Sequence, residues 1–310
     1  MVVENKLTIG SRGSKLALWQ AGHIADRLRE RHPGLGVNIE IIKTKGDKIL
    51  DVALSKVGGK GLFTKELEDA LLQGSVDLAV HSLKDLPTEL PDKLEAEIIT
   101  RREHGFDALL CRENVSLADI PLGATIGTSS LRRKVQLATF RPDWVFKDLR
   151  GNVDTRIRKL EAGEYDAIVL AEAGLVRLGL QGKITELLDP SRVIPAAGQG
   201  ALALEYRGND ESTRELIGFL NDSKTNHEVR AERAFLGRLG GGCQVPIGAH
   251  AELREDGSLL LVGMISDLEG KNIMRGSIVG VPGDDAGTRL AERLLAGGAQ
   301  AIVDEIYGDS

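Results

Sequence analysis

The sequence is poor in cysteine and has no long apolar run. Its 310 residues contain two cysteines, Cys111 and Cys243, too few for a disulfide framework or for paired zinc ligands. No apolar stretch approaches the roughly 20 residues that cross a bilayer. The first residues lack the basic-then-apolar pattern of a secretion signal. Six scattered histidines predict no metal site. We therefore expect a cytoplasmic, metal-free protein that does not enter a membrane.

The sequence also has fewer basic than acidic residues. The formal net charge is −6, which argues against general binding of nucleic acids. Arginine and lysine are nevertheless concentrated in residues 129–134 and 150–159, beside glycine, serine and threonine. Such clusters on an acidic protein predict a pocket for a small polyanion, although a solvated helix face would explain them as well.

The apolar segments predict two α/β lobes and a smaller α+β domain with a three-stranded antiparallel sheet. A chain of this length exceeds one ordinary core. Alternating and apolar runs predict strands at residues 6–10, 37–44, 75–81, 124–128, 249–254, 259–266 and 272–280. Helices are expected after Ser14, over 64–73, from residue 226, and over 285–307 with a break at Gly297-Gly298. We place domain 1 at residues 1–100 and 200–218, domain 2 at 105–195, and domain 3 at 223–310.

Two short patterns repeat between the lobes. Thr8-Ile9-Gly10-Ser11 and Thr125-Ile126-Gly127-Thr128 match at an offset of 117. Leu71-x-x-Gly74-x-x-Asp77 and Leu160-x-x-Gly163-x-x-Asp166 match at an offset of 89. They indicate a weak internal duplication, or a chance match, because a strand that ends in glycine before a helix is common.

Basic side chains follow several predicted strand ends, where open α/β sheets bind their ligands. Helix N-termini at the same edge favour carboxylates or phosphates. The residues that this placement favours for anion binding are Arg12, Lys84, Arg132, Arg133, Arg150 and Arg156.

The second cysteine lies in an unusual loop, Gly240-Gly241-Gly242-Cys243-Gln244-Val245-Pro246. The glycines and Pro246 disfavour regular structure, so Cys243 is expected on a turn. Its thiolate could form a permanent carbon–sulfur bond, or it could be a buried loop cysteine. Cys111 lies in an apolar strand and is interpreted as an inert core thiol.

Eight stretches, in their order along the chain, resemble the porphobilinogen deaminase (hydroxymethylbilane synthase) family. They are Ala17–Gln20, Val57–Phe63, His81–Pro87, Gly127–Arg133, Leu149–Asn152, Tyr165–Ile168, Gly198–Ala201 and Gly241–Pro246. Residues 102–107 depart from the family pattern where the first lobe passes into the second.

The resemblance implies a three-domain fold whose first two lobes are similar to type-2 solute-binding proteins, with the strand after Gly200 in the first. It implies a transferase that joins four porphobilinogen molecules head to tail with loss of ammonia, and releases hydroxymethylbilane for haem biosynthesis. It also implies a dipyrromethane cofactor bound through a thioether to Cys243, and a monomer.

The resemblance also implies the site residues. Asp85 is expected to be catalytic, because a carboxylate can stabilise the pyrrole cations and move protons. The expected cofactor ligands are Cys243, Lys84, Asp85, Thr128, Ser129, Ser130, Arg132 and Arg133. The expected substrate ligands are Arg12, Ser14, Lys56, Lys60, Arg150, Arg156 and Gln199.

Two other functions remain open from the residues alone. Two lobes could close on an anion without chemistry, as in a cytosolic binding module. A cysteine acyltransferase would need a histidine beside Cys243; none is near in sequence, although His81 could approach in space.

Overall fold

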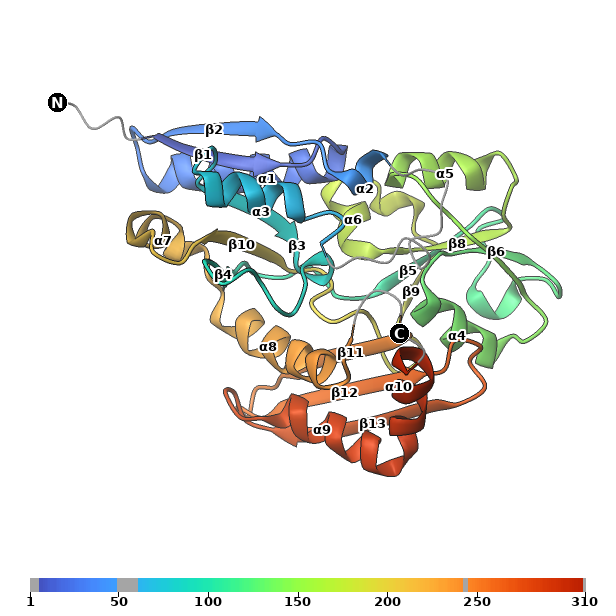
Figure 1. Cartoon of the computed structure of the whole chain (residues 1–310). Coiled ribbons are helices and arrows are strands. Elements are labelled where there is room, and N and C mark those ends of the chain that lie inside the picture. The colour runs from blue at the N-terminus through green and yellow to red at the C-terminus, as the bar shows by residue number, and fades with distance from the viewer. Residues whose placement is uncertain (1–5, 49–60, 242–244, 309–310) are drawn as a thin grey trace. The chain divides into compact units, whose positions relative to one another are not determined.

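The computed structural model describes residues 6–48, 61–241 and 245–308 (Figure 1). The described chain divides into two compact units. The first contains residues 6–48, 61–102 and 201–226, and is called the first lobe here. The second contains residues 103–200, 227–241 and 245–308. Its residues 103–200 are called the second lobe.

The first lobe is built on one five-stranded sheet. The strand order is β2 (Gly36–Ile41), β1 (Lys6–Ser11), β3 (Leu78–Ser82), β10 (Leu202–Arg207) and β4 (Leu94–Ile99). Its helices are α1 (Lys15–Arg31), α2 (Lys45–Lys48), α3 (Lys65–Gln73), the short 3-10 helix Leu83–Asp85, α7 (Glu211–Ile217) and the 3-10 helix Gly218–Leu220. Strand β10 runs antiparallel to β3 and β4, which confirms that the strand after Gly200 returns to the first lobe.

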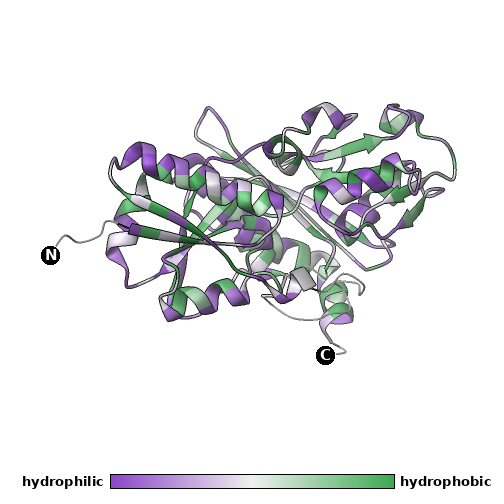
Figure 2. Cartoon of the chain, turned by 90° about the horizontal axis from the view of Figure 1, so that it is seen from above, coloured by the Kyte–Doolittle hydropathy of each residue, from purple (hydrophilic) through white to green (hydrophobic). Residues whose placement is uncertain are grey.

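Helix α1 covers this sheet with one apolar face. Its N-cap is Ser14, whose hydroxyl accepts a hydrogen bond from Ala17 N at 3.2 Å, as the sequence predicted. Ile24 and Leu28 are fully buried and pack in the core with Ile9 of β1. In Figure 2 the helices carry hydrophobic and hydrophilic residues in alternation, as expected of helices that bury one side.

The second lobe repeats this architecture. Its strand order is β7 (Val145–Lys147), β6 (Thr125–Gly127), β8 (Ala167–Ala171), β5 (Asp107–Cys111) and β9 (Glu186–Leu188). Its helices are the 3-10 helix Leu117–Asp119, α4 (Leu131–Phe140), α5 (Val153–Glu161), α6 (Glu172–Arg177) and the 3-10 helix Gln181–Lys183. In both sheets the fourth strand runs antiparallel to its neighbours.

The internal duplication predicted from the sequence holds at the level of strand register. In the first lobe Ile9 pairs with Leu78 and Gly10 with Ala79. In the second lobe Ile126 pairs with Ala167 and Gly127 with Ile168, which are the positions given by the offsets of 117 and 89. The two sequence repeats therefore mark equivalent strands.

The repeated aspartates do the same work in each lobe. Asp77 Oδ2 accepts the backbone N–H of Thr8 at 2.9 Å, and Asp166 Oδ2 accepts that of Thr125 at 2.8 Å. Each aspartate also pairs with one arginine, Arg207 for Asp77 and Arg112 for Asp166, both at 3.1 Å. Each carboxylate thus links the residue that precedes one strand to a backbone N–H of the neighbouring strand.

The rest of the second unit forms an antiparallel sheet covered by helices. The strands are β11 (Ile247–Leu253), β12 (Leu259–Ser266) and β13 (Ile273–Gly280), in that order. The helices are α8 (Ser223–Arg238), whose first four residues belong to the first unit, α9 (Ala286–Leu294), the π-type segment Leu295–Ala299 and α10 (Gln300–Tyr307). Phe235 of α8 is fully buried against β12, where a Cβ at Gly263 would meet its ring at 2.5 Å. The predicted helix break is confirmed by Gly298, whose φ is 121°.

Several predicted boundaries are wrong by two or three residues; β3 begins at Leu78 and not at residue 75, and β11 begins at Ile247 and not at residue 249. Helix α8 begins at Ser223 rather than at residue 226, because Asp222 Oδ1 accepts the N–H of Thr225 at 2.8 Å and caps the first turn. Strand β2 ends at Ile41 rather than at residue 44, where its pairing with β1 ends.

The described residues contain neither a membrane-spanning helix nor a cluster of metal ligands. No helix there has the length and apolarity needed to span a bilayer. No group of three or more acidic, histidine or cysteine side chains in the same part of the chain could hold a metal ion.

Candidate functional site

A small cavity of about 70 Å³ opens at the ends of β1 and β3 in the first lobe. Its lining includes Arg12, Ser14, His81 and Asp85, three of which the sequence assigned to the site. Strands β1 and β3 are parallel neighbours, so their carboxyl ends meet at one edge of the sheet. The residues that follow them therefore reach the same cavity.

Asp85 is held at this edge by a short turn. The 3-10 helix Leu83–Asp85 starts directly after β3, and Leu83 is buried while Asp85 is exposed. The backbone N–H of Leu83 donates to Ala201 O at 3.0 Å, which ties the turn to the chain entering β10. A rigid strand and one buried leucine thus present the Asp85 carboxylate to the cavity, with Lys84 beside it in sequence.

Arg12 lies over an aromatic ring in the same cavity. Its guanidinium carbon is 4.3 Å from the centre of the Phe63 ring, a cation–π distance. A guanidinium group in such a contact can also bind carboxylates through its N–H groups.

Buried polar groups lie behind the cavity. His81 Nε2 contacts Glu205 Oε2 at 2.8 Å, and both residues are almost completely buried. Glu68 of α3 is also buried, and its burial raises the pKa of that carboxyl, as does the negative charge of Glu205. The sequence analysis gave no role to Glu68 or Glu205.

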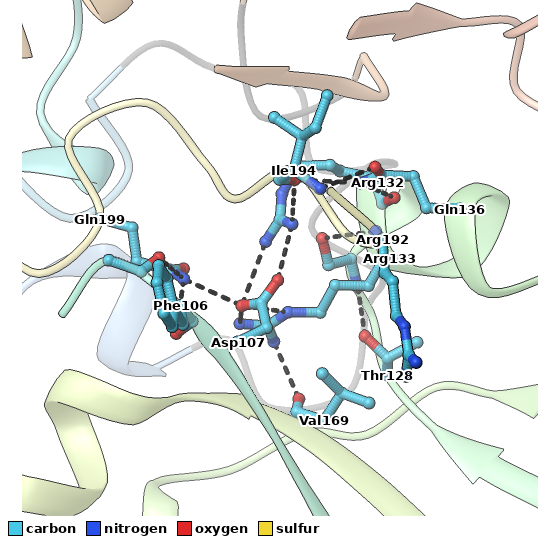
Figure 3. A network of polar contacts seen from close by, with 12 residues as sticks. Phe106, Asp107, Thr128, Arg132, Arg133, Gln136, Val169, Arg192, Ile194 and Gln199 are labelled. Carbon is cyan, nitrogen blue, oxygen red and sulfur yellow. Dashed lines mark hydrogen bonds and ion pairs between the residues drawn. The ribbon is translucent and has the colours of Figure 1, made fainter. Parts of the chain in front are cut away.

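A second cluster of charge is buried in the second lobe, where Arg132 and Arg133 of α4 both bind Asp107 (Figure 3). Arg132 Nη1 donates to Asp107 Oδ2 at 2.7 Å, and Arg133 Nη2 donates to Oδ1 at 2.7 Å. Gln199 Nε2 donates to the same Oδ1 at 2.9 Å. Backbone carbonyls of Ile194 and Val169 accept further N–H groups of the two arginines.

This cluster carries more positive than negative charge. Burial by itself disfavours the charged carboxylate, but the ion pairs with Arg132 and Arg133 outweigh it and hold the pKa of Asp107 far below its usual value. Two guanidinium groups then face one carboxylate. Among the described residues no acceptor contacts Nε of Arg132. The donor set suits an additional anion, and guanidinium groups bind carboxylates strongly through charge-assisted hydrogen bonds.

The neighbouring hydroxyl residues order the loops at the same end of the second lobe. Ser130 caps α4 by accepting Arg133 N at 3.4 Å, and Thr128 Oγ1 accepts Ser130 N at 3.2 Å. Ser129 Oγ donates to Leu149 O at 2.9 Å, which holds the loop after β6 against the loop after β7. Two more expected ligands lie in and after that second loop. Arg150 is half-buried, and Arg156 Nε donates to Gly151 O at 2.7 Å.

The structure therefore groups the expected residues in two places. Arg12, Ser14 and Asp85, next to Lys84, belong to the first lobe, whereas the expected residues from Thr128 to Gln199 belong to the second unit. Lys56, Lys60 and Cys243 lie outside the described residues.

Asp107 is the main residue that the sequence analysis missed. The sequence analysis placed residues 102–107 where the first lobe passes into the second and gave Asp107 no role. The usable signal was an aspartate at the head of the apolar strand Asp107–Cys111, because a carboxylate there must be buried and needs cationic partners.

Comparison with known proteins identifies the family. Residues 7–215 match the family model described as "Porphobilinogen deaminase, dipyromethane cofactor binding domain", and residues 226–296 match the porphobilinogen deaminase C-terminal domain. The chain belongs to the porphobilinogen deaminase family. The porphobilinogen deaminase of Maridesulfovibrio salexigens is 53% identical over 305 residues, covering 97% of this chain and 98% of the relative. That of Geobacter sulfurreducens is 51% identical over 305 residues, covering 98% and 95%.

A solved extracellular-binding protein of Bacillus subtilis, ytmK, is more distant. It is 12% identical and aligns with a TM-score of 0.40 over 69% of this chain and 89% of that one. The match to the cofactor-binding domain includes both groups of residues described above, and Cys243 falls within the match to the C-terminal domain.

Proposed function

We propose that this chain joins four porphobilinogen molecules head to tail, releases four ammonia molecules, and hydrolyses the product to hydroxymethylbilane. The support is family membership together with a cavity that exposes one carboxylate, Asp85, beside one arginine, Arg12. A porphobilinogen molecule carries an acetate, a propionate and an aminomethyl group. Those groups call for cationic ligands and for a proton donor.

A dipyrromethane fits the charge of the second-lobe cluster. We infer that Arg132 and Arg133, with Ser130, Thr128, Ser129 and Lys84, bind its carboxylates and that Cys243 anchors it through a thioether. The excess of one positive charge around Asp107 supports this assignment. When bound, the group supplies the pyrrole to which the first substrate is joined.

Asp85 is the residue to which we assign the chemistry. Its carboxyl group can give a proton to the substrate amine, which leaves as ammonia. Its carboxylate then stabilises the positive charge that remains on the pyrrole. Arg12, with Arg150, Arg156, Ser14, Gln199, Lys56 and Lys60, is assigned to the substrate and to the growing chain.

The remaining features are finer assignments. We propose a cytoplasmic monomer with three domains, at residues 1–100 with 200–218, at 105–195, and at 223–310. A non-catalytic anion-binding module is not favoured, because the chain belongs to a family of enzymes.

A product assay tests this function. Purified protein is incubated with porphobilinogen, and hydroxymethylbilane and ammonia are measured. We expect four ammonia molecules for each product molecule, and no product from Cys243→Ser. A wild-type protein without product would overturn the function; a fully active Cys243→Ser variant would overturn the anchor.

A further inference from the structure

The buried groups behind the Asp85 cavity form one cluster, defined as Glu68, His81 and Glu205. His81 lines the cavity that Asp85 and Arg12 also line. Its Nε2 contacts Glu205 Oε2 at 2.8 Å, whereas Glu205 Oε1 is buried without a hydrogen-bond partner in the described chain. Glu68 lies close enough for its charge to interact with both. The cluster thus extends from the cavity wall into the core.

The second lobe shows that the fold does not require these polar groups. The offset of 89 places Glu68 at Ile157 and His81 at Leu170. Glu205 pairs with Ala79 of β3, and Leu110 pairs with the equivalent Ile168 of β8, so Glu205 corresponds to Leu110. All three equivalents are apolar, buried and members of one hydrophobic cluster.

Burial of these polar groups in the first lobe is unfavourable in free energy and is not needed for the fold. A buried carboxylate loses its hydration, and an apolar trio of similar size is commonly as stable or more stable. The same framework already accepts leucine and isoleucine at these positions in the second lobe. Residues that break a local rule at a cavity wall are expected to serve function.

We propose that Glu68, His81 and Glu205 form a proton-holding cluster for the Asp85 cavity, in which Glu205 positions His81. The Glu205 side chain accepts a hydrogen bond from Nε2–H of the imidazole and fixes that tautomer. The other ring nitrogen, Nδ1, then has a lone pair that can take a proton from the cavity. In this arrangement His81 holds the proton, and Glu205 is the positioning residue.

The proton balance of the reaction gives the cluster its task. This inference rests on the proposed function. In each condensation the leaving amine gains one proton as it departs as ammonia, and a pyrrole ring carbon loses one proton as the new carbon–carbon bond forms. His81 Nδ1 takes up the second proton and returns it to Asp85 for the next amine. The enzyme is unchanged after each addition.

Several charged groups surround His81 and affect how the reaction rate depends on pH. Glu205 lies on β10, and Glu68 and Asp69 lie on α3. On the cavity side are Arg12 and Asp85. Asp69 is exposed and points away from the core, so Asp69→Asn removes one charge from the same helix without entering the cluster.

The first experiment transfers the apolar trio of the second lobe into the first, as Glu68→Ile/His81→Leu/Glu205→Leu. We expect a melting temperature equal to or above that of the wild type and a kcat lower by about 100-fold, the usual effect of losing a proton-transfer group. A melting temperature below the wild type would make the cluster structural and overturn the inference. Wild-type kcat in a stable triple variant would do so as well.

The second experiment separates positioning from packing. His81→Gln keeps a polar side chain that cannot hold the proton. This variant should have a lower kcat with little change in KM, and its kcat–pH profile should lack one limb. Asp69→Asn should keep both limbs. An unchanged profile in His81→Gln would contradict the proposal.

Imidazole nitrogen NMR provides a readout independent of activity. The resonance that disappears in His81→Gln is assigned to His81. In the wild-type protein this imidazole should be the Nε2–H tautomer. Glu205→Gln should lower the population of that tautomer. A wild-type Nδ1–H tautomer would overturn the proposal. Wild-type protein is assayed in parallel: if it makes no hydroxymethylbilane, the proposed function itself fails, whereas an equally active triple variant removes only this inference.

Discussion

The two lobes have the same strand order and the same register, yet their buried charges lie at different positions. The first lobe buries Glu68, His81 and Glu205, where the second has Ile157, Leu170 and Leu110. The second lobe buries Asp107 with two arginines, whereas the equivalent strand position of the first lobe holds Leu202, since Asp107 pairs with Ala171 and Leu202 with Ser82.

This difference separates framework from function. Groups that recur in both lobes, such as Asp77 and Asp166, support the sheets. So do Gly10 and Gly127, at which an added Cβ would meet Leu67 at 3.1 Å and Tyr165 at 2.8 Å respectively. Buried charges that occur in one lobe only are the ones to which we assign chemistry and anion binding.

The largest effect is expected at Asp85, for which the offset of 89 gives a glycine, Gly174, in the second lobe. Asp85→Asn should lower kcat by about 10³–10⁴-fold, because the amide cannot donate or accept the transferred proton. Circular dichroism should be unchanged, since Asp85 is exposed. Rates close to wild type would remove Asp85 from the mechanism.

A large loss of stability is expected from Asp107→Leu, which copies Leu202 of the first lobe. The change leaves Arg132 and Arg133 buried without their carboxylate, and should lower the free energy of unfolding by about 3–5 kcal/mol in urea titrations. The matched control Asp107→Leu/Arg132→Met/Arg133→Leu removes the charges together and should recover most of the loss. A single variant as stable as wild type would show that the ion cluster is not needed for folding.

Equal effects are expected from Asp77→Ala and Asp166→Ala. Each removes one backbone contact and one arginine pair of matching length, so each should cost about 1–3 kcal/mol in the same assay. A difference of more than about 1 kcal/mol between them would break the equivalence of the lobes.

A smaller, graded effect is expected from pH. The pKa of Asp107 is lower in the folded than in the unfolded state. The ionised carboxylate therefore stabilises the protein fully above the unfolded-state pKa of about 4, and progressively less below it. The stability difference between wild type and Asp107→Asn should therefore shrink by up to about 1.4 kcal/mol per pH unit as the pH falls from 4 to 2. A difference that stays constant over this range would contradict the depressed pKa.

Much of the framework could be predicted because it depends on local patterns. Ser14 was identifiable as the residue before a helix, and the two repeats were identifiable as equivalent strands. The grouping of Arg12 with Asp85 followed from strand ends meeting at one edge of a sheet.

The buried partners could not be predicted in the same way. Asp107 and Arg132 are 25 residues apart, and His81 and Glu205 are 124 apart, so only the folded sheet shows that they meet. Arginine beside serine and glycine predicts an anion site, but not that a carboxylate of the same chain occupies part of it.

The mass of the intact purified protein tests the account most directly. We predict a stable addition of two pyrrole units, which peptide mapping assigns to Cys243 and which is reduced or absent in Arg133→Leu. A wild-type protein with the bare mass of its amino acids would contradict the account.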